Sequence, residues 1–325
     1  MPNEALQVEH LRHVYGTRVA LDDVSFSVAR GEIFGLLGPN GGGKTTLFKI
    51  LSTLMPATGG SASVFGDALE RAPAAVRRHL GVVFQHPSLD DKLTVLENLH
   101  CHGYLYGLHG ARLHERTRTV LQRLGLADRA AERVEALSGG LRRRTELAKA
   151  LLHQPPVLLL DEPSTGLDPG ARRDFIQYLR ELRERDGVTI VLTTHYMDEA
   201  ERCDRVAILH QGTLVSVGTP ADLKDRVGGD IVVMQAQDPE RLRQKVQERF
   251  ACEAAVVDGT VRVERPRGHE FVRDVVDAFP ADITAVTYGK PTLEDVFIHL
   301  TGHRFWDGTG ASGSAASGGA GEGSA

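Results

Sequence analysis

The chain has 325 residues, a formal net charge of −5, and 25% charged and 41% hydrophobic residues, which is ordinary for a globular protein of two domains. The acidic balance argues against broad nucleic-acid binding, which needs a basic surface. Three widely spaced cysteines without a CxxC pair argue against a disulfide framework or a zinc site. No apolar run is long enough to span a bilayer, so we expect any work at a membrane to go through a partner protein.

An alternating strand near the start of the chain precedes the first strong motif. It ends at Tyr15, whose ring could stack on a nucleobase, although a half-buried strand tyrosine is the commoner interpretation. The segment GPNGGGKT, 38–45, then follows a strand-like GEIFGLL and precedes a helix-like TLFKILSTL, with Leu54 on its expected core stripe. It matches GxxxxGKS/T, in which backbone N–H groups converge on phosphates. The strand–loop–helix context argues against a chance match, and we expect Lys44 to reach the β- and γ-phosphates and Thr45 to bind Mg²⁺.

Helical patterns dominate the next part of the chain, from about residue 90 to 150, which we interpret as an inserted helical subdomain. Just before it, Gln85 follows an apolar run, and its amide oxygen could bind Mg²⁺ or water, although a solvent-facing loop glutamine is commoner. Within it, Ser138 and two glycines precede an amphipathic helix, so free N–H groups offer a second anion-binding helix start. Solvated surface positions are predicted for the run Arg142–Arg144 and for the histidines of this region, His100, His102, His109 and His114.

Two acids follow the continuous apolar strand PVLLLDE, which is typical of a strand buried on both faces. We expect Asp161 to hold Mg²⁺ and Glu162 to orient the attacking water or accept its proton. His195, at the end of the strand VTIVLTTH, would contact the γ-phosphate or hold that water, since open α/β sheets place ligand contacts at the carboxyl ends of strands. The competing interpretations are an acid pair that caps a helix and a histidine satisfied by backbone, and the first becomes minor beside a phosphate loop.

A second domain is predicted after a composition shift at 226–230. Before it, LHQGTLV predicts a hairpin that turns at Gln211–Gly212. Beyond it, 230–302 has the order β-α-β-β-α-β of a ferredoxin-like unit followed by a helix with Thr292 as its N-cap. Its hairpin turns at Asp258–Gly259, a pair suited to a type I′ turn. The Gly/Ser/Ala-rich segment 308–325 is predicted to be a flexible tail without a site.

Seven motifs, taken in chain order, resemble those of the ATP-binding subunit of ABC transporters. They are the A-loop Tyr15, Walker A 38–45, the Q-loop Gln85, the signature LSGG 137–140, Walker B 157–162, the D-loop TGLD 165–168 and the H-loop His195. Two departures are visible, because Gly42 stands where Ala or Ser is usual and Leu141 replaces a common Gln. The segments LSTLMPATGG, SGGLRRRTELAKAL and PTLEDVFIHLTG are similar to the ABC-2 export group, such as daunorubicin-type drug efflux ATPases.

The resemblance implies a P-loop NTPase fold of the ABC-ATPase type over 1–227, α/β with an inserted helical subdomain, plus the small α+β domain at 230–302. It implies ATP and Mg²⁺ as ligands, Glu162 and His195 as catalytic residues, and Thr45, Gln85 and Asp161 as metal ligands. The nucleotide-binding residues it implies are Tyr15, Gly38, Pro39, Asn40, Gly41, Gly42, Gly43, Lys44, Thr45, Thr46, Gln85, Ser138, Gly139, Gly140 and Asp168.

The two phosphate-binding helix starts find an explanation in the same resemblance. It implies a homodimer, or a heterodimer with a paralogue, that clamps each of two ATP molecules between the P-loop of one subunit and Ser138–Gly140 of the other. ATP-driven closure would energise an integral membrane permease that exports a drug, a lipid or another hydrophobic or polysaccharide substrate. The protein would then lie at the cytoplasmic face of the membrane, and no nucleic-acid partner is expected.

Two other functions compete with this interpretation. A soluble member of the same superfamily could act in DNA repair or translation, but repair members separate the phosphate loop from the signature by long coiled coils, and translation factors carry two cassettes. This chain has a short gap without sustained heptads and one cassette. An unrelated P-loop kinase or GTPase would explain neither LSGG nor His195.

Overall fold

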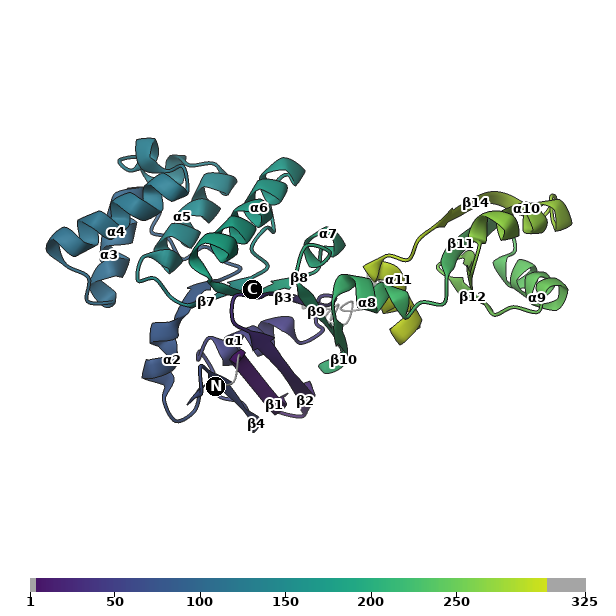
Figure 1. Cartoon of the computed structure of the whole chain (residues 1–325), viewed down its shortest axis with the longest axis horizontal. Coiled ribbons are helices and arrows are strands. Elements are labelled where there is room, and N and C mark those ends of the chain that lie inside the picture. The colour runs from purple at the N-terminus through teal and green to yellow at the C-terminus, as the bar shows by residue number, and fades with distance from the viewer. Residues whose placement is uncertain (1–3, 303–325) are drawn as a thin grey trace, which may run out of the picture.

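A six-stranded central sheet organises the computed structural model, which describes residues 4–302 (Figure 1). The strand order is β10-β9-β3-β8-β7-β6, and all neighbours are parallel except the hairpin of β9 and β10. Every residue of β3, β7 and β8 is buried, which the continuous apolar run of β7 predicts for that strand. The strands are β3 (Ile33–Leu37), β6 (Leu80–Val83), β7 (Val157–Asp161), β8 (Thr189–Thr194), β9 (Arg205–His210) and β10 (Thr213–Gly218).

An antiparallel sheet covers one face of the central sheet, with helix α1 (Lys44–Leu51) between the two layers. Leu47 and Leu51 of α1 belong to the core that both sheets share. The helix ends at Leu51, so the expected core position Leu54 is wrong, and its side chain is 61% exposed. The order of this sheet is β2-β1-β4-β5, and its strands are β1 (Glu4–Tyr15), β2 (Arg18–Ala29), β4 (Gly59–Val64) and β5 (Asp67–Ala68).

Helices cover the opposite face of the central sheet (Figure 1). A capping box at Thr94, closed by Glu97, fixes the start of the first of them, and Ser138 and Asp168 are the N-caps of the last two. These helices are α3 (Val95–Leu105), α4 (Gly110–Arg123), α5 (Gly139–Leu151) and α6 (Pro169–Asp186), with short turns η1 (Ala127–Arg129) and η2 (Val134–Ala136) before α5. Shorter helices lie elsewhere in the chain: α2 (Pro73–His79), α7 (Met197–Ala200) and α8 (Pro220–Asp225).

A separate four-stranded sheet follows α8 and projects from one end of the molecule (Figure 1). Its strands are antiparallel in the order β12-β13-β11-β14, and α9 and α10 pack on one face of it. Asp258 and Gly259 have φ of 47° and 70°, as a type I′ turn requires. The elements are β11 (Asp230–Ala236), α9 (Pro239–Phe250), β12 (Ala254–Val257), β13 (Thr260–Arg265), α10 (Gly268–Ala278) and β14 (Ile283–Gly289).

Helix α11 (Leu293–Thr301) joins this sheet to the rest of the chain. Phe297 lies in the larger core and α11 contacts α8 and α7, while Asp295 forms an ion pair with Arg262 of β13. Across residues 4–302, no helix combines the length and the apolar character of a membrane span. The predicted tail at 308–325 lies outside the described residues.

Candidate functional site

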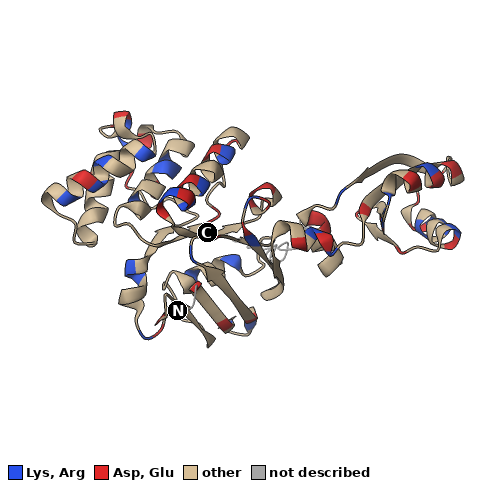
Figure 2. Ribbon diagram, viewed as in Figure 1, with Lys and Arg blue, Asp and Glu red and all other residues tan. Residues whose placement is uncertain are grey.

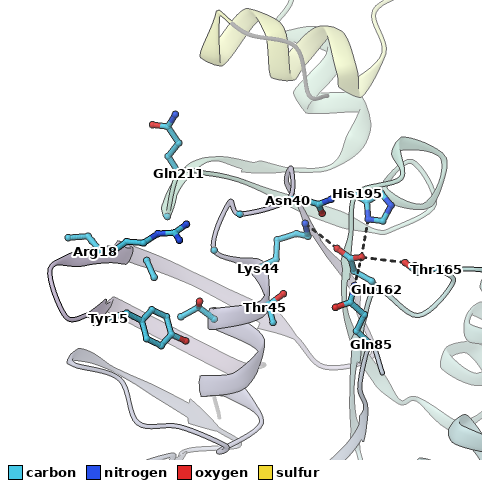
Figure 3. A pocket seen from close by; sticks show the side chains of 16 residues that line it. Tyr15, Arg18, Asn40, Lys44, Thr45, Gln85, Glu162, Thr165, His195 and Gln211 are labelled. Carbon is cyan, nitrogen blue, oxygen red and sulfur yellow. Dashed lines mark hydrogen bonds and ion pairs between the residues drawn. The ribbon is translucent and has the colours of Figure 1, made fainter. Parts of the chain in front are cut away.

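A cavity of about 600 Å³ opens at the carboxyl ends of five parallel strands (Figure 3). The phosphate loop follows β3, and Gln85, Glu162, His195 and Gln211 follow β6, β7, β8 and β9. The ends of neighbouring parallel strands meet at one edge of a sheet, so residues far apart in sequence converge there. The strand β8 ends at Thr194, so His195 lies just after it and not within it.

The loop at 38–45 encloses the ammonium group of its own lysine. Lys44 Nζ donates hydrogen bonds to the carbonyls of Gly38 at 2.7 Å and Pro39 at 3.1 Å. A side chain at position 38 would place its Cβ 2.4 Å from the Leu209 carbonyl, so only glycine fits. Gly43 has φ of 102°, a left-handed conformation that directs the chain into α1. The start of α1 faces the cavity, and the N–H groups at a helix start suit the binding of an anion.

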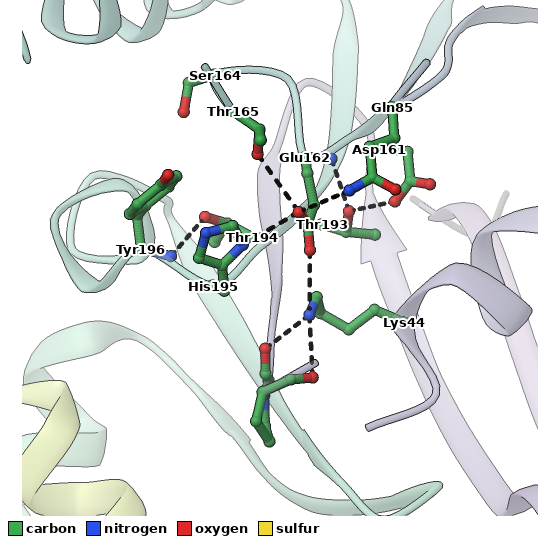
Figure 4. A network of polar contacts seen from close by, with 12 residues as sticks. Lys44, Gln85, Asp161, Glu162, Ser164, Thr165, Thr193, Thr194, His195 and Tyr196 are labelled. Atoms are coloured by element: carbon green, nitrogen blue, oxygen red, sulfur yellow. Dashed lines mark hydrogen bonds and ion pairs between the residues drawn. The ribbon is translucent and has the colours of Figure 1, made fainter. Parts of the chain in front are cut away.

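Glu162 is the centre of the polar network in the cavity (Figure 4). Its carboxylate lies 3.3 Å from Lys44 Nζ and 3.1 Å from His195 Nδ1, and it accepts a hydrogen bond from Gln85 Nε2 at 3.2 Å. Its φ is 43°, and its N–H donates to Thr193 Oγ1 at 2.8 Å. A non-glycine residue in this region is strained, and such strain is common where a functional side chain must be aimed.

The charges around Glu162 keep its carboxyl group ionised. Burial acts to raise its pKa, but the hydrogen bond with His195 and the charge of Lys44 outweigh this and lower the pKa to about 2. Burial in turn lowers the pKa of Lys44, although Glu162 opposes this. The cavity therefore holds the Glu162 carboxylate beside Lys44, the cation that a triphosphate would attract. The carboxylate and the triphosphate would compete for the Lys44 ammonium group.

Oxygen donors suited to a hard divalent cation surround this carboxylate. Thr45 and Gln85 line the cavity, and the Gln85 amide donates through its nitrogen to Glu162, which leaves its carbonyl oxygen as an acceptor. Asp161 is buried behind the lining, where its Oδ1 accepts a hydrogen bond from Thr193 Oγ1 at 2.6 Å. Burial raises the pKa of Asp161. A hydroxyl, an amide oxygen and a carboxylate fit Mg²⁺, and a cation would also offset the burial of Asp161.

Most of the predicted nucleotide-binding residues, and both predicted catalytic residues, lie together in this cavity. Those that line it are Tyr15, Asn40, Gly41, Gly43, Lys44, Thr45, Thr46, Gln85, Glu162 and His195, whereas Gly38, Pro39 and Gly42 shape the loop from behind. The Tyr15 ring is 47% exposed, and its hydroxyl donates to Met55 Sδ at 3.3 Å.

The cavity does not include the second anion-binding helix start. Ser138 is exposed at the N-cap of α5, followed by Gly139 and Gly140, and its hydroxyl accepts the Leu141 N–H at 3.4 Å. Asp168 is also exposed and caps α6 by accepting two backbone N–H groups at 2.9 Å. Neither residue reaches the cavity of its own chain.

Sequence analysis missed six residues that line the cavity, namely Arg18, Val19, Ala20, Thr165, Gln211 and Gly212. Arg18 lies across the β1–β2 turn from Tyr15, and its proximity to that ring in sequence was a usable signal. Gln211 was expected only as a turn residue. The packing of the antiparallel sheet against the loop brings Arg18 to the cavity, and no local pattern reveals that contact.

The prediction that Arg142–Arg144 is a solvated face is wrong for Arg143. Its guanidinium is buried and donates to four backbone carbonyls, those of Pro163 at 2.6 Å, Phe84 at 2.7 Å, Asp161 at 3.2 Å and Glu162 at 3.4 Å. Arg143 thus joins the helix that begins at Ser138 to the strand ends that carry Gln85 and Glu162. The buried residues Glu146 and Lys149 follow Arg143 at successive intervals of three, which is typical of one helical face and could have revealed it.

The histidine predictions are wrong at two positions in α3. His100 and His102 are partly buried, whereas His109 and His114 are exposed as predicted. Burial is the largest cause that lowers the pKa of His102, to about 4, and it lowers the pKa of His153 to about 4 as well. Tyr106 stacks on His153 with ring centroids 3.8 Å apart, so these rings form a small packed cluster on the helical part of the chain.

Comparison with known proteins gives consistent relatives. A protein-family model described as ABC transporter matches residues 21–165. The linearmycin resistance ATP-binding protein LnrL of Bacillus subtilis (strain 168) is 35% identical in an alignment of 319 residues that covers 93% of this chain and 100% of that protein. The Nod factor export ATP-binding protein I of Paraburkholderia xenovorans (strain LB400) is 37% identical over 317 residues, covering 94% of this chain and 100% of the relative.

Solved structures agree with this likeness. A structure described as an ATP-binding subunit of an ABC transporter has a TM-score of 0.62 and 34% identity, covering 69% of this chain and 93% of the other. The dimeric post-hydrolysis structure of the ATP-binding cassette MJ0796, bound to ADP and Pi, has a TM-score of 0.61 and 28% identity, covering 66% of this chain and 98% of the other. In that cassette, ADP and phosphate are held by a dimer.

Proposed function

Because the chain belongs to the family of ABC transporter ATP-binding proteins, we propose that it binds and hydrolyses ATP to energise an integral membrane exporter. The observation that carries this proposal is the meeting of Lys44, Glu162 and His195 in one cavity at the strand ends. The names of the relatives mention linearmycin resistance and Nod factor export, so we place the exported substrate among drugs, lipids and other hydrophobic or saccharide-bearing compounds.

Glu162 changes its state when the triphosphate arrives. The phosphates attract the Lys44 ammonium away from the Glu162 carboxylate, and Glu162 thereby loses one of the cations that hold its pKa low. The carboxylate then becomes a better acceptor for the proton of the attacking water, which His195 helps to hold beside the γ-phosphate. Tyr15 offers a face on which the nucleobase stacks.

Mg²⁺ would be held by Thr45, Gln85 and Asp161. When bound, this ion neutralises charge on the transferred phosphate. The residues of this chain supply its oxygen ligands from the start of α1 and from the ends of β6 and β7.

The exposed second helix start, Ser138 to Gly140, serves the nucleotide of another subunit in this proposal. Two like subunits, or this chain and a paralogue, would pack head to tail so that each Ser138 and Asp168 reaches the cavity of the partner. A two-fold axis forms both contacts at once and closes the assembly. Each ATP then makes more contacts in the closed dimer than in the open one and shifts the population towards closure.

The chain is proposed to divide into an ATP-binding domain at 1–227, with its helical subdomain at about 90–150, and an accessory domain at 230–302. The strand order of the accessory sheet and its two helices on one face support a ferredoxin-like type. Partnership with a permease would place the protein at the cytoplasmic face of the membrane. A superfamily member that acts on nucleic acid or ribosomes is not favoured, since the relatives in hand are transport proteins.

ATP hydrolysis by the purified chain tests the proposal. We expect Mg²⁺-dependent hydrolysis that falls by about 10³-fold in Glu162→Gln, because the acceptor of the water proton is lost, while ATP stays bound. Glu115→Gln, at an exposed position, is the matched control and keeps the rate of hydrolysis. Loss of ATP binding in Glu162→Gln, or an unchanged rate of hydrolysis, would contradict the role proposed for Glu162.

Affinity capture from membranes tests the partner. It should recover an integral membrane protein, whereas capture of ribosomes or DNA would favour the alternative function.

A further inference from the structure

The strand β14 leaves one edge of the C-terminal sheet open. It pairs with β11 on one side, and within residues 4–302 no strand pairs with it on the other. Five of its seven residues are exposed, so a row of backbone N–H and C=O groups faces outward. The opposite edge strand, β12, has only four residues and α9 packs beside it. A short length is an ordinary protection of an edge, and β14, with seven residues, lacks it; a bulge at Thr284 interrupts its pairing with β11.

The sequence of β14 lacks two further protections of an edge, charged residues and proline. Residues 283–289 read ITAVTYG and contain no charged residue and no proline. In Figure 2 the strand is tan throughout, whereas the helices beside it carry many charges. Two large apolar side chains are exposed here, Tyr288 at 55% and Val276 at 38%, and Val276 belongs to the helix α10 that packs on β14. An open, uncharged edge with apolar neighbours is a template for another strand.

The charges that flank β14 select the strand that fits. Asp282 precedes it and Lys290 follows it. If β14 pairs antiparallel with itself about Val286, Asp282 of one copy lies opposite Lys290 of the other at both ends of the ladder. A parallel arrangement would instead place like charges together. Both charges also have a partner in their own chain, Asp282 with Lys245 at 2.6 Å and Lys290 with Asp230 at 2.7 Å. The Lys290 side chain is 88% exposed, so it remains within reach of a second carboxylate.

We propose that β14 of one chain pairs antiparallel with β14 of a second copy, in the register centred on Val286. The register sets Ala285 opposite Thr287 and Thr284 opposite Tyr288. The two sheets then form one eight-stranded sheet with α9 and α10 of both copies on the same face, and the two-fold axis closes the assembly. This contact needs no nucleotide. It holds two subunits together while the ATP-driven contact opens, and its failure is distinguishable from failure of the shared ATP site.

Disulfide trapping in the full chain tests the pairing. Val286→Cys is made in a background of Cys101→Ser, Cys203→Ala and Cys252→Ser, and the protein is oxidised without nucleotide. Opposed Cβ atoms on paired strands lie close enough for a disulfide, so we expect about tenfold more covalent dimer than in the matched control Val257→Cys, on the other edge. Equal trapping at the two edges, or none at Val286→Cys, would overturn the proposal, and would leave the edge to a strand of another protein.

Two exposed positions keep the test independent of the partly buried Val286. Thr284→Cys and Tyr288→Cys should each trap little dimer alone, because the register sets each opposite the other residue. A mixture of the two variants should form the mixed disulfide. A Thr284→Cys homodimer without the mixed product would show a different register and overturn the one proposed. Unchanged thermal unfolding of the reduced variants establishes that the folded protein is trapped.

Discussion

The Arg143 guanidinium connects α5, the helix that begins after Ser138, to the strand ends that carry Gln85 and Glu162. Removing the guanidinium tests this connection. Arg143→Met keeps most of the side-chain volume but deletes four hydrogen bonds to the carbonyls of Phe84 and residues 161–163. A hydrogen bond from a charged donor contributes about 1.5–3 kcal/mol, and such bonds are not additive. Since the four share one guanidinium and its burial cost is also removed, we expect the free energy of unfolding to fall by about 3 kcal/mol.

The effect on catalysis should separate from the effect on binding. Arg143 contacts the backbone of Glu162 and does not contact the phosphate loop, so kcat should fall about tenfold or more while KM changes less than about threefold. Chemical denaturation and steady-state ATP hydrolysis at a temperature where both proteins are folded measure the two effects. Arg144→Met is the matched control, with a loss below about 1 kcal/mol. If Arg143→Met loses less than this and keeps its kcat, the proposed link through Arg143 is refuted.

Three further outcomes follow from the site. Lys44→Ala should weaken ATP binding about tenfold or more in calorimetry, because Lys44 is the cation aimed at the phosphates. The ordinary pKa of Glu162 is 4.5, and its pKa in the folded protein is about 2. The ionised carboxylate therefore stabilises the fold above pH 4.5, and this contribution is lost as the pH falls towards 2. Unfolding curves of Glu162→Gln should lack that part of the loss of stability in acid. His102 and His153 have pKa values of about 4 in the folded protein, compared with an ordinary value of 6.5. As the pH falls, the unfolded state therefore binds protons first, and the free energy of unfolding should decrease from pH 6.5 to 4. His102→Gln should reduce this pH dependence, and His109→Gln, at an exposed position, should not.

Local sequence patterns were sufficient where one segment alone determines the structure. The phosphate loop is marked by glycines between a strand and a helix, and the hairpin turns at Gln211–Gly212 and Asp258–Gly259 each by a glycine, which accepts positive φ. The predicted N-cap Thr292 caps its helix through hydrogen bonds that close at Asp295, three residues on. In such cases the physical cause is local.

Tertiary packing determined the features that the sequence did not reveal. Arg143 looked like part of a solvated run, but the face of α5 that carries it is turned towards the strand ends, where four carbonyls solvate its charge. Arg18 enters the cavity only because the antiparallel sheet packs over the phosphate loop. Leu54 lies past the end of α1, so the helical period no longer applies to it. The placements of Arg143 and Arg18 depend on contacts between segments that are distant in sequence, and that of Leu54 on where a helix ends.

The central claim is that the two half-sites for a triphosphate join only across a subunit boundary. Copies that carry Ser138→Cys and copies that carry Asn40→Cys are mixed in a Glu162→Gln background without the native cysteines, and oxidised with and without ATP–Mg²⁺. The account predicts a mixed disulfide that forms only with ATP and only between the two kinds of copy. A disulfide within one chain that carries both cysteines, or no mixed product at saturating ATP, would contradict it.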